Sequence, residues 1–169
     1  CSIVLNTQKL INQCKDKWLF HENLREIDAP YAIPSSIVGD FDRMVANLGL
    51  PFLLKPRCGH GAKGLVEVDG KATWSTHCQR VGDDLMAQTI VGKDDEEYTI
   101  AVFGDGLGGY GPGITLRRTL SPLGFTERAV VCSLEGSKRA LDHLCSRFKP
   151  LGPTNFQFRM DNGELKLLE

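Results

Sequence analysis

What the sequence lacks narrows the classes of protein that it can encode. No uninterrupted apolar run among its 169 residues approaches the roughly 18 residues that a membrane-spanning helix needs. No signal-peptide pattern opens the chain. A large excess of charge of either sign is also missing, because the formal net charge is −1, and this argues against a dedicated nucleic-acid surface. We therefore expect neither a membrane nor a nucleic acid as a partner.

The cysteines form no recognisable pattern. Six are present, none of them in a C-x-x-C pair, and their spacing matches no zinc site. Reduced thiols that pack as small hydrophobic groups are the simplest interpretation, and they indicate a cytoplasmic protein. A start methionine is missing too, and the sequence stops inside an alternating apolar run at Glu169. We therefore expect a fragment of a larger protein.

The order of the predicted helices and strands indicates an α+β fold with antiparallel sheets. Apolar residues recur every three or four positions in helices and every second position in strands. These patterns predict helices over residues 6–27, 40–47, 73–81 and 136–148, and strands over 51–56, 65–68, 85–91, 98–103, 114–119, 154–160 and 164–169. Because the strands do not alternate regularly with helices, a parallel βαβ arrangement is disfavoured.

The stretch over residues 51–69 has the pattern of a strand, a glycine-rich loop and a second strand. Its glycines at 59, 61 and 64 match G-x-G-x-x-G. A Rossmann site requires a helix after such a loop, and a P-loop requires Lys-Ser or Lys-Thr; neither follows here. A kinase glycine loop fits the hairpin, but no H-R-D or D-F-G motif follows. A loop over nucleotide phosphates and a plain surface hairpin remain, and Lys55, at the end of a rigid strand, favours the former.

The last predicted hairpin carries two oxygen-bearing side chains, Gln157 and Glu169. A two-residue turn at Asn162-Gly163 would place them on opposite faces of the sheet. A three-residue turn with a left-handed Gly163 would pair Asn155 with Glu169 and place Gln157 and Glu169 on one face, within reach of one cation. Oxygen ligands of this kind suit Mg²⁺. Two unrelated surface residues are the alternative.

Taken together, these stretches resemble the ATP-grasp fold, nearest to the ATP-binding domains of carbamoyl-phosphate synthase and related carboxylate–amine ligases. The motifs that carry the resemblance are Asp16-Lys17, residues 51–57 with the glycine loop, residues 86–92 followed by Glu97-Tyr98, and residues 152–157 with 167–169. The resemblance implies two small lobes with antiparallel sheets that clasp ATP between them. Residues 1–30 and 92–169 would form the central lobe with the metal-ligand hairpin, and residues 31–91 the smaller lobe with the lid loop.

The resemblance also implies the role of individual residues. Lys17 and Lys55 would contact ATP phosphates, and the loop with Gly59, Gly61, Lys63 and Gly64 would fold over them. Gln88 would accept a hydrogen bond from adenine where the family has a glutamate, and the backbone of Ile90 would pair with the ring. Glu97 would bind ribose hydroxyls. Gln157 and Glu169 would hold Mg²⁺, with Mn²⁺ as a second candidate ion.

The implied activity is ATP-dependent ligation of a carboxylate to an amine or ammonia through an acyl phosphate. The partners would be ATP, an unidentified carboxylate and amine, and further domains of the same polypeptide, without which the fragment is not expected to complete a turnover. A non-catalytic nucleotide-binding module and a small-molecule kinase are the alternatives, and no catalytic side chain is assigned. One of Arg117 and Arg118 should face each side of a strand, where the inward one could steady an acyl phosphate or form an exposed ion pair.

Overall fold

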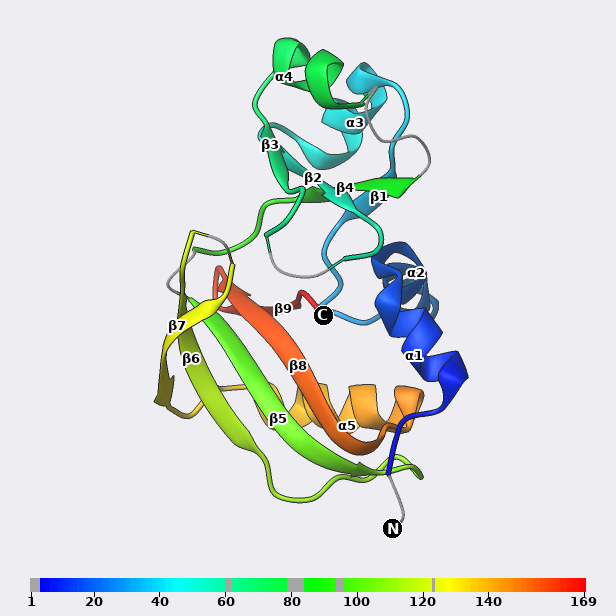
Figure 1. The fold of residues 1–169 in the computed structure, drawn as a ribbon, viewed down its shortest axis with the longest axis vertical. Coiled ribbons are helices and arrows are strands. Elements are labelled where there is room, and N and C mark those ends of the chain that lie inside the picture. The colour runs from blue at the N-terminus through cyan, green and yellow to red at the C-terminus, as the bar shows by residue number, and fades with distance from the viewer. Residues whose placement is uncertain (1–3, 60–61, 79–83, 94–95, 123) are drawn as a thin grey trace.

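Two antiparallel sheets, each with its own hydrophobic core, make up the structure (Figure 1). The computed structural model describes residues 4–59, 62–78, 84–93, 96–122 and 124–169. The predicted α+β class with antiparallel sheets is confirmed. Within the described ranges, no helix has both the length and the apolar character needed to cross a membrane.

The smaller sheet has the strand order β1-β4-β2-β3. Its elements are β1 (Ser35–Ile37), α3 (Phe41–Leu48), β2 (Phe52–Pro56), β3 (Val66–Val68), α4 (Lys71–His77) and β4 (Leu85–Thr89). Phe52 and Leu54 of β2 are fully buried in a core with Met44 of α3 and Trp74 of α4. Because side chains alternate along a strand, Lys55 projects from the other face of this sheet. The helices thus cover one face, and the face that carries Lys55 is left for other contacts.

The larger sheet has the order β7-β6-β5-β8-β9. Its elements are β5 (Glu97–Asp105), β6 (Ile114–Leu120), β7 (Thr126–Val131), α5 (Ser137–Phe148), β8 (Leu151–Asp161) and β9 (Glu164–Leu167). Leu144 and Cys145 of α5 pack against Ile100, Phe156 and Phe158 on one face of this sheet. By the same alternation, the neighbouring residues of β5 and β8 project from the face that α5 does not cover.

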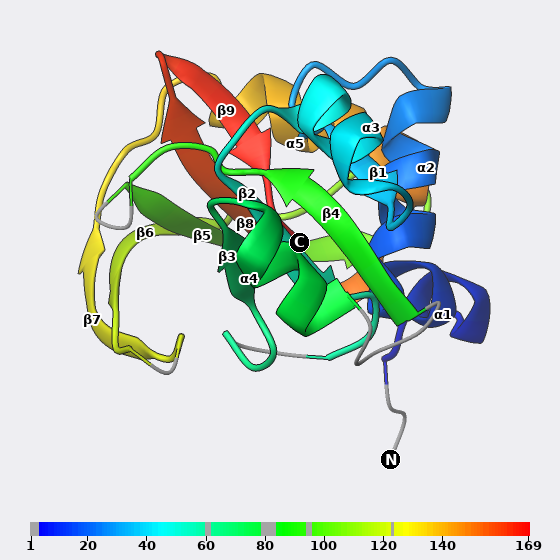
Figure 2. The same ribbon diagram turned by 90° about the horizontal axis from the view of Figure 1, so that it is seen from above.

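The smaller sheet sits at one end of the larger one, and the carboxyl-terminal end of the chain lies between them (Figure 1). Helix α5 lies behind the larger sheet in Figure 1, and seen from above the strands of the smaller sheet lie in front of the larger sheet (Figure 2). A direct contact joins the two parts, because a Cβ built at Gly124, in the β6–β7 turn, would lie 2.5 Å from the backbone nitrogen of Ala62 in the glycine loop. The loop of the smaller sheet therefore touches the edge of the larger sheet.

The first helix was predicted as one piece over residues 6–27, and this is wrong. The structure has α1 (Gln8–Lys15) and α2 (Lys17–Glu26), with Asp16 in an extended conformation between them. The carboxylate of Asp16 accepts hydrogen bonds from the backbone N–H groups of Trp18 and Leu19, as an N-cap does. Apolar spacing continued through the break, so periodicity did not reveal it.

Two further strands were not predicted, and two predicted helices have slightly different bounds in the structure. Strands β1 and β7 were not predicted, because β1 is very short and every side chain of β7 is exposed, which removes the alternation. Helix α3 agrees closely with the helix predicted over residues 40–47: Asp40 is its N-cap, and Gly49, whose φ of 75° suits glycine, follows its last residue. Helix α4 begins before its predicted start, and residues 79–81 of that prediction lie outside the described residues.

Candidate functional site

Lys55 is a buried lysine in the middle of the smaller sheet. Strand β2 is paired on both sides, with β3 and β4, which makes the position rigid. The side chain is only 7% exposed, and its Nζ donates a hydrogen bond to Oε1 of Gln88 at 2.6 Å. Leu53 is the direct partner of Gln88, so Lys55 and Gln88 form a diagonal pair on one face.

Burial changes the acidity of Lys55. Removal from water and, second, the nearby charge of Lys17 lower its pKa from 10.5 to about 8, and Glu169 opposes this shift. The amide of Gln88 satisfies one N–H of the ammonium group but contributes no charge. Lys55 is therefore a cation that an incoming anion would stabilise, and this suits a phosphate contact.

The side-chain amide of Gln88 has a defined orientation. A lysine ammonium can only donate, so the group that faces Lys55 must be Oε1. Nε2 then donates to Oγ of Ser35 at 2.8 Å, and that hydroxyl donates in turn to the carbonyl of Ile33 at 2.9 Å. This chain of hydrogen bonds holds the amide in place and leaves Oε1 with a further lone pair.

Lys17 connects the start of α2 with two distant segments. Its Nζ donates to the carbonyl oxygen of Gly59 at 2.8 Å and lies 3.3 Å from Oε1 of Glu169. Its backbone N–H donates to the carbonyl of Arg57 at 2.8 Å. The structure thus brings Lys17, the base of the glycine loop and the last residue of the chain together, near Lys55.

Asp16 and Arg57 form a second connection at the base of the loop, and neither had been assigned a role from the sequence. Nε and Nη2 of Arg57 donate to the two carboxylate oxygens of Asp16 at 3.2 and 2.6 Å. Burial acts to raise the pKa of Asp16, but the hydrogen bonds from Arg57, Leu19 and Trp18 and the charge of Arg57 outweigh it, so the net shift is downward. The adjacency of Asp16 to the predicted phosphate contact Lys17 was the available signal.

The glycine loop lies between these contacts and the β6–β7 turn. Gly59 and Gly64 have φ values of 142° and 80°, and a Cβ at Gly64 would lie 2.8 Å from the ring of Pro56. Both positions therefore favour glycine for local reasons. Lys63 is exposed, and Gly61 lies outside the described residues.

The junction after β4 requires a glycine. Ile90 is half-buried just beyond the end of the strand. Gly92 has a φ of 59°, and a Cβ there would lie 2.3 Å from the carbonyl oxygen of Met160. Its N–H donates to Oδ1 of Asp161 at 3.1 Å. The junction at Gly92 is thus fastened to the β8–β9 hairpin by close backbone packing.

Glu97 is buried among arginines. It is 3% exposed, and its carboxylate accepts hydrogen bonds from Nη2 of Arg118 and, at 3.2 and 3.1 Å, from Nε and Nη2 of Arg159. Arg118 also donates to Oε1 of Gln157 at 3.1 Å. A ribose hydroxyl would have to share this carboxylate with two guanidinium groups.

The last hairpin has a different turn from the one that favoured a metal site. Asp161 pairs with Glu164, and Asn162 and Gly163 both have positive φ, of 50° and 81°. This is a two-residue hairpin turn of type I′, so of the two turns that the sequence allowed, the three-residue turn with its pairing of Asn155 and Glu169 does not form. Asparagine accepts the left-handed conformation more readily than most residues, which makes the shorter turn accessible.

The end of the hairpin is irregular around Gln157. The N–H of Leu168 donates to the carbonyl of Gln157 at 2.7 Å, but the N–H of Gln157 donates to the carbonyl of Glu169 at 2.8 Å. Two residues thus face one, as in a β-bulge, and simple alternation does not apply to Glu169. The side chain of Glu169 contacts Lys17, whereas that of Gln157 contacts Arg118.

The oxygen donors of Gln157 and Glu169 are of the kind that Mg²⁺ prefers, and they fit a metal in chemical type. Each is held by a cation, which a bound metal would have to replace. Within the described ranges, no cluster of three or more aspartate, glutamate, histidine or cysteine side chains is arranged to bind a metal. The two residues could therefore supply only part of a coordination shell.

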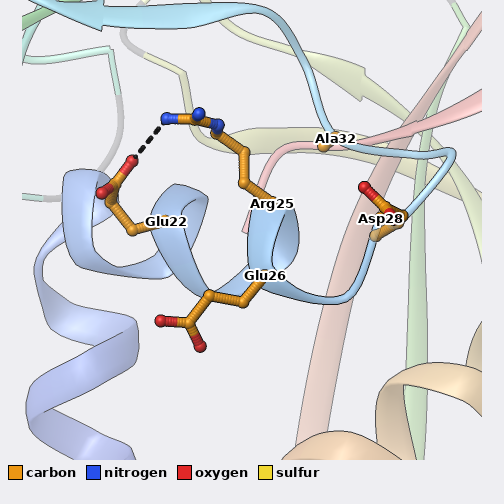
Figure 3. Close-up of a pocket in the computed structure, with 6 residues that line it drawn as sticks. Glu22, Arg25, Glu26, Asp28 and Ala32 are labelled. Atoms are coloured by element: carbon orange, nitrogen blue, oxygen red, sulfur yellow. Dashed lines mark hydrogen bonds and ion pairs between the residues drawn. The ribbon is translucent and has the colours of Figure 1, made fainter.

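A surface hollow of about 540 Å³ lies away from these residues, along α2 and the segment that follows it (Figure 3). Its lining includes Glu22, Arg25, Glu26 and Asp28. Glu22 and Arg25 point toward one another and are paired at 3.0 Å, and Glu26 is paired with Arg147 at 2.8 Å. Because these charges are paired on the surface, we assign no function to the hollow.

Comparison with known proteins yields matches among solved structures only. No protein-family model matches the sequence, and no curated protein matches it. The chain is similar to N5-carboxyaminoimidazole synthetase from Staphylococcus aureus complexed with ADP, with a TM-score of 0.78 and 17% identity over 97% of this chain and 46% of that one. It is also similar to D-alanine–D-alanine ligase from Bacillus anthracis, with a TM-score of 0.76 and 18% identity over 98% of this chain and 58% of that one.

A third similar structure is the biotin carboxylase domain of the Hydrogenobacter thermophilus 2-oxoglutarate carboxylase, in complex with MgADP, ADP and bicarbonate. Its TM-score is 0.76 at 18% identity, over 98% of this chain and 41% of that one. The chain thus spans between 41% and 58% of the length of these three proteins. It has the ATP-grasp fold that its sequence resembles.

Proposed function

We propose that this chain is the ATP-binding part of a ligase that joins a carboxylate to an amine or ammonia through an acyl phosphate. The observation that carries the proposal is the meeting of Lys17, Lys55 and Glu169 at the base of the glycine loop. These residues come from α2, β2 and the end of the chain, and the convergence of a buried lysine, a half-buried lysine and an exposed carboxylate favours a functional site. The ADP, MgADP and bicarbonate in the similar structures point in the same direction.

In this proposal each segment of the site has one task. Lys17 and Lys55 bind the phosphates, and the loop with Gly59, Gly61, Lys63 and Gly64 covers them. Gln88 and the backbone of Ile90 bind adenine, and Glu97 binds ribose. Gln157 and Glu169 contribute ligands to Mg²⁺ or Mn²⁺, which would neutralise charge on the phosphates when bound.

The chemistry assigned to these residues is positioning and charge stabilisation. A carboxylate oxygen of the substrate attacks the γ-phosphorus of ATP, the bond to the bridging oxygen breaks, and ADP leaves with that electron pair. The nitrogen of the amine or ammonia then attacks the acyl carbon, and inorganic phosphate leaves as the nitrogen loses a proton. Lys17 and Lys55 favour the first step because they hold positive charge beside the transferring group.

Within this class, the motifs favour an enzyme that is similar to carbamoyl-phosphate synthase. Bicarbonate, which is bound in the similar biotin carboxylase structure, and ammonia are therefore the first candidate substrates. A non-catalytic nucleotide-binding module is the second candidate. It is favoured by one observation: both proposed metal ligands are already paired with cations.

Two measurements test the proposal. Calorimetric titration of the protein with MgADP and with MgATP should show micromolar or tighter binding, and absence of binding would contradict the proposal. ADP release from MgATP should then be measured with bicarbonate alone and with bicarbonate plus ammonium. Release that needs neither would favour a kinase acting on another acceptor, and binding without any release would favour the non-catalytic module.

A further inference from the structure

Arg118 lies on the face of the larger sheet that α5 does not cover. Its neighbours across the sheet, Glu97 and Ala129, are its direct partners in β5 and β7. The next residue along β6, Arg117, pairs with Tyr98 and Val130, and its side chain leaves the opposite face. Strand geometry therefore separates two consecutive arginines, and only Arg118 joins the face that carries Glu97 and Gln157.

The guanidinium group of Arg118 is incompletely satisfied. Nη2 donates to Oε1 of Glu97 and to Oε1 of Gln157, and Nη1 donates to Oγ1 of Thr126 at 3.2 Å. Nε of Arg118 is buried and has no hydrogen-bond partner in the part of the chain that the structure describes. Because buried N–H groups in native proteins are nearly always paired, this orphaned donor requires an explanation.

Among the residues that the structure describes, Glu97 is the only charged acceptor of Arg118. Its acceptors Gln157 and Thr126 are neutral. The carboxylate of Glu97 accepts hydrogen bonds from Arg159 as well as from Arg118, so Arg118 does not have this acceptor to itself. A cation whose buried Nε–H has no partner among the described residues thus lies beside Gln157, a residue that we assign to the metal.

We propose that Arg118 binds the oxyanion of the substrate, first as a carboxylate and then as the acyl phosphate. The inference rests on the proposed function and adds to it the residue that recognises the non-nucleotide substrate. A guanidinium group binds carboxylates and phosphates through two adjacent N–H groups, and Nε with Nη2 forms one such pair. An oxyanion on this edge satisfies Nε and competes with Gln157 and Glu97 for Nη2.

The test uses acetylphosphonate, whose acyl carbon is bonded directly to phosphorus, so that it presents an acyl group and a phosphoryl oxyanion but cannot transfer the phosphoryl group. Its affinity is measured by calorimetry on the protein saturated with MgADP, for the wild type, Arg118→Ala, Arg118→Lys and Arg117→Ala. We expect Arg118→Ala to weaken acetylphosphonate binding at least tenfold and to change MgADP affinity less than threefold. Arg118→Lys keeps the charge but loses Nε, and should weaken binding severalfold. Arg117→Ala is the matched control and should leave both affinities unchanged.

Each outcome decides a different point. If Arg118→Lys unfolds at the same temperature as the wild type and binds acetylphosphonate equally well, the proposal that Nε and Nη2 of Arg118 bind the oxyanion is overturned. A wild type that binds MgADP but not acetylphosphonate overturns it as well. If the wild type binds no MgADP, the proposed function is contradicted instead. Titration of acetylphosphonate into the nucleotide-free proteins then tests whether Arg118 binds an oxyanion.

Discussion

The ammonium group of Lys55 donates a hydrogen bond of 2.6 Å to the side-chain oxygen of Gln88 inside the smaller sheet. This contact joins the residue assigned to the phosphates with the residue assigned to adenine. In the protein without nucleotide, the ammonium group of Lys55 is therefore hydrogen-bonded to Gln88, and a bound phosphate would replace Gln88 as its acceptor. Binding would exchange a neutral acceptor for a charged one, which favours the complex.

Replacing Lys55 with alanine should weaken binding of MgADP by about 10- to 100-fold, because a hydrogen bond to a charged group contributes about 1.5–3 kcal/mol. Calorimetry measures the change. Lys71→Ala removes an exposed lysine at the start of α4 and serves as the control. If Lys55→Ala binds MgADP as tightly as Lys71→Ala does, Lys55 has no phosphate role.

Binding should also depend on pH through Lys55, whose pKa is lowered to about 8 mainly by burial. Phosphate binding requires the protonated amine, so affinity should be constant below pH 8 and fall by up to about tenfold per pH unit above it. Gln88→Glu places a carboxylate beside the ammonium group, which raises the pKa of Lys55 and should move the bend in the profile to higher pH. Dissociation constants measured from pH 6.5 to 9.5 for both proteins test this, and coincident profiles would contradict it.

Glu169→Gln should reduce the effect of Mg²⁺ on ADP binding by about tenfold, since a hard cation prefers a charged oxygen ligand. The quantity to measure is the ratio of ADP affinities with and without Mg²⁺. Glu164→Gln at the other end of the hairpin is the control, because Glu164 is exposed and pairs with Lys166. An unchanged ratio in Glu169→Gln would remove Glu169 from the metal site.

Asp16 performs two structural tasks that substitution can separate. Asp16→Ala loses both the cap of α2 and the ion pair with Arg57, and should lower the free energy of unfolding by about 2 kcal/mol. Asp16→Asn keeps a capping oxygen and loses only the charge, so we expect a loss of about 1 kcal/mol. Urea unfolding compares the two variants, and equal losses would show that the cap contributes little.

The sequence allowed the strongly periodic elements to be predicted. The helix predicted over residues 136–148 is α5, and its apolar residues at helical spacing, Ala140, Leu141, Leu144 and Cys145, are all buried. The glycine loop lies between two antiparallel strands, as its flanking pattern indicated. These features follow from local spacing and from the φ requirements of glycine, which act within a few residues.

Site chemistry was predictable only in part. The order and spacing of the motifs along the sequence were sufficient to predict the fold. It did not indicate that Arg57 binds Asp16, or that Arg118 and Arg159 divide Glu97 between them. Those pairs join residues far apart along the chain, and no local pattern specifies which charges meet.

By itself, the sequence determined the α+β class, the glycine-rich hairpin and the residue types available to a nucleotide site. The tertiary structure alone decided the break at Asp16, the exposed edge strand β7 and the two-residue turn at Asn162-Gly163. It also decided that Lys55 is buried against Gln88. Local periodicity and turn propensity are short-range, whereas strand register, burial and charge pairing depend on which segments pack together.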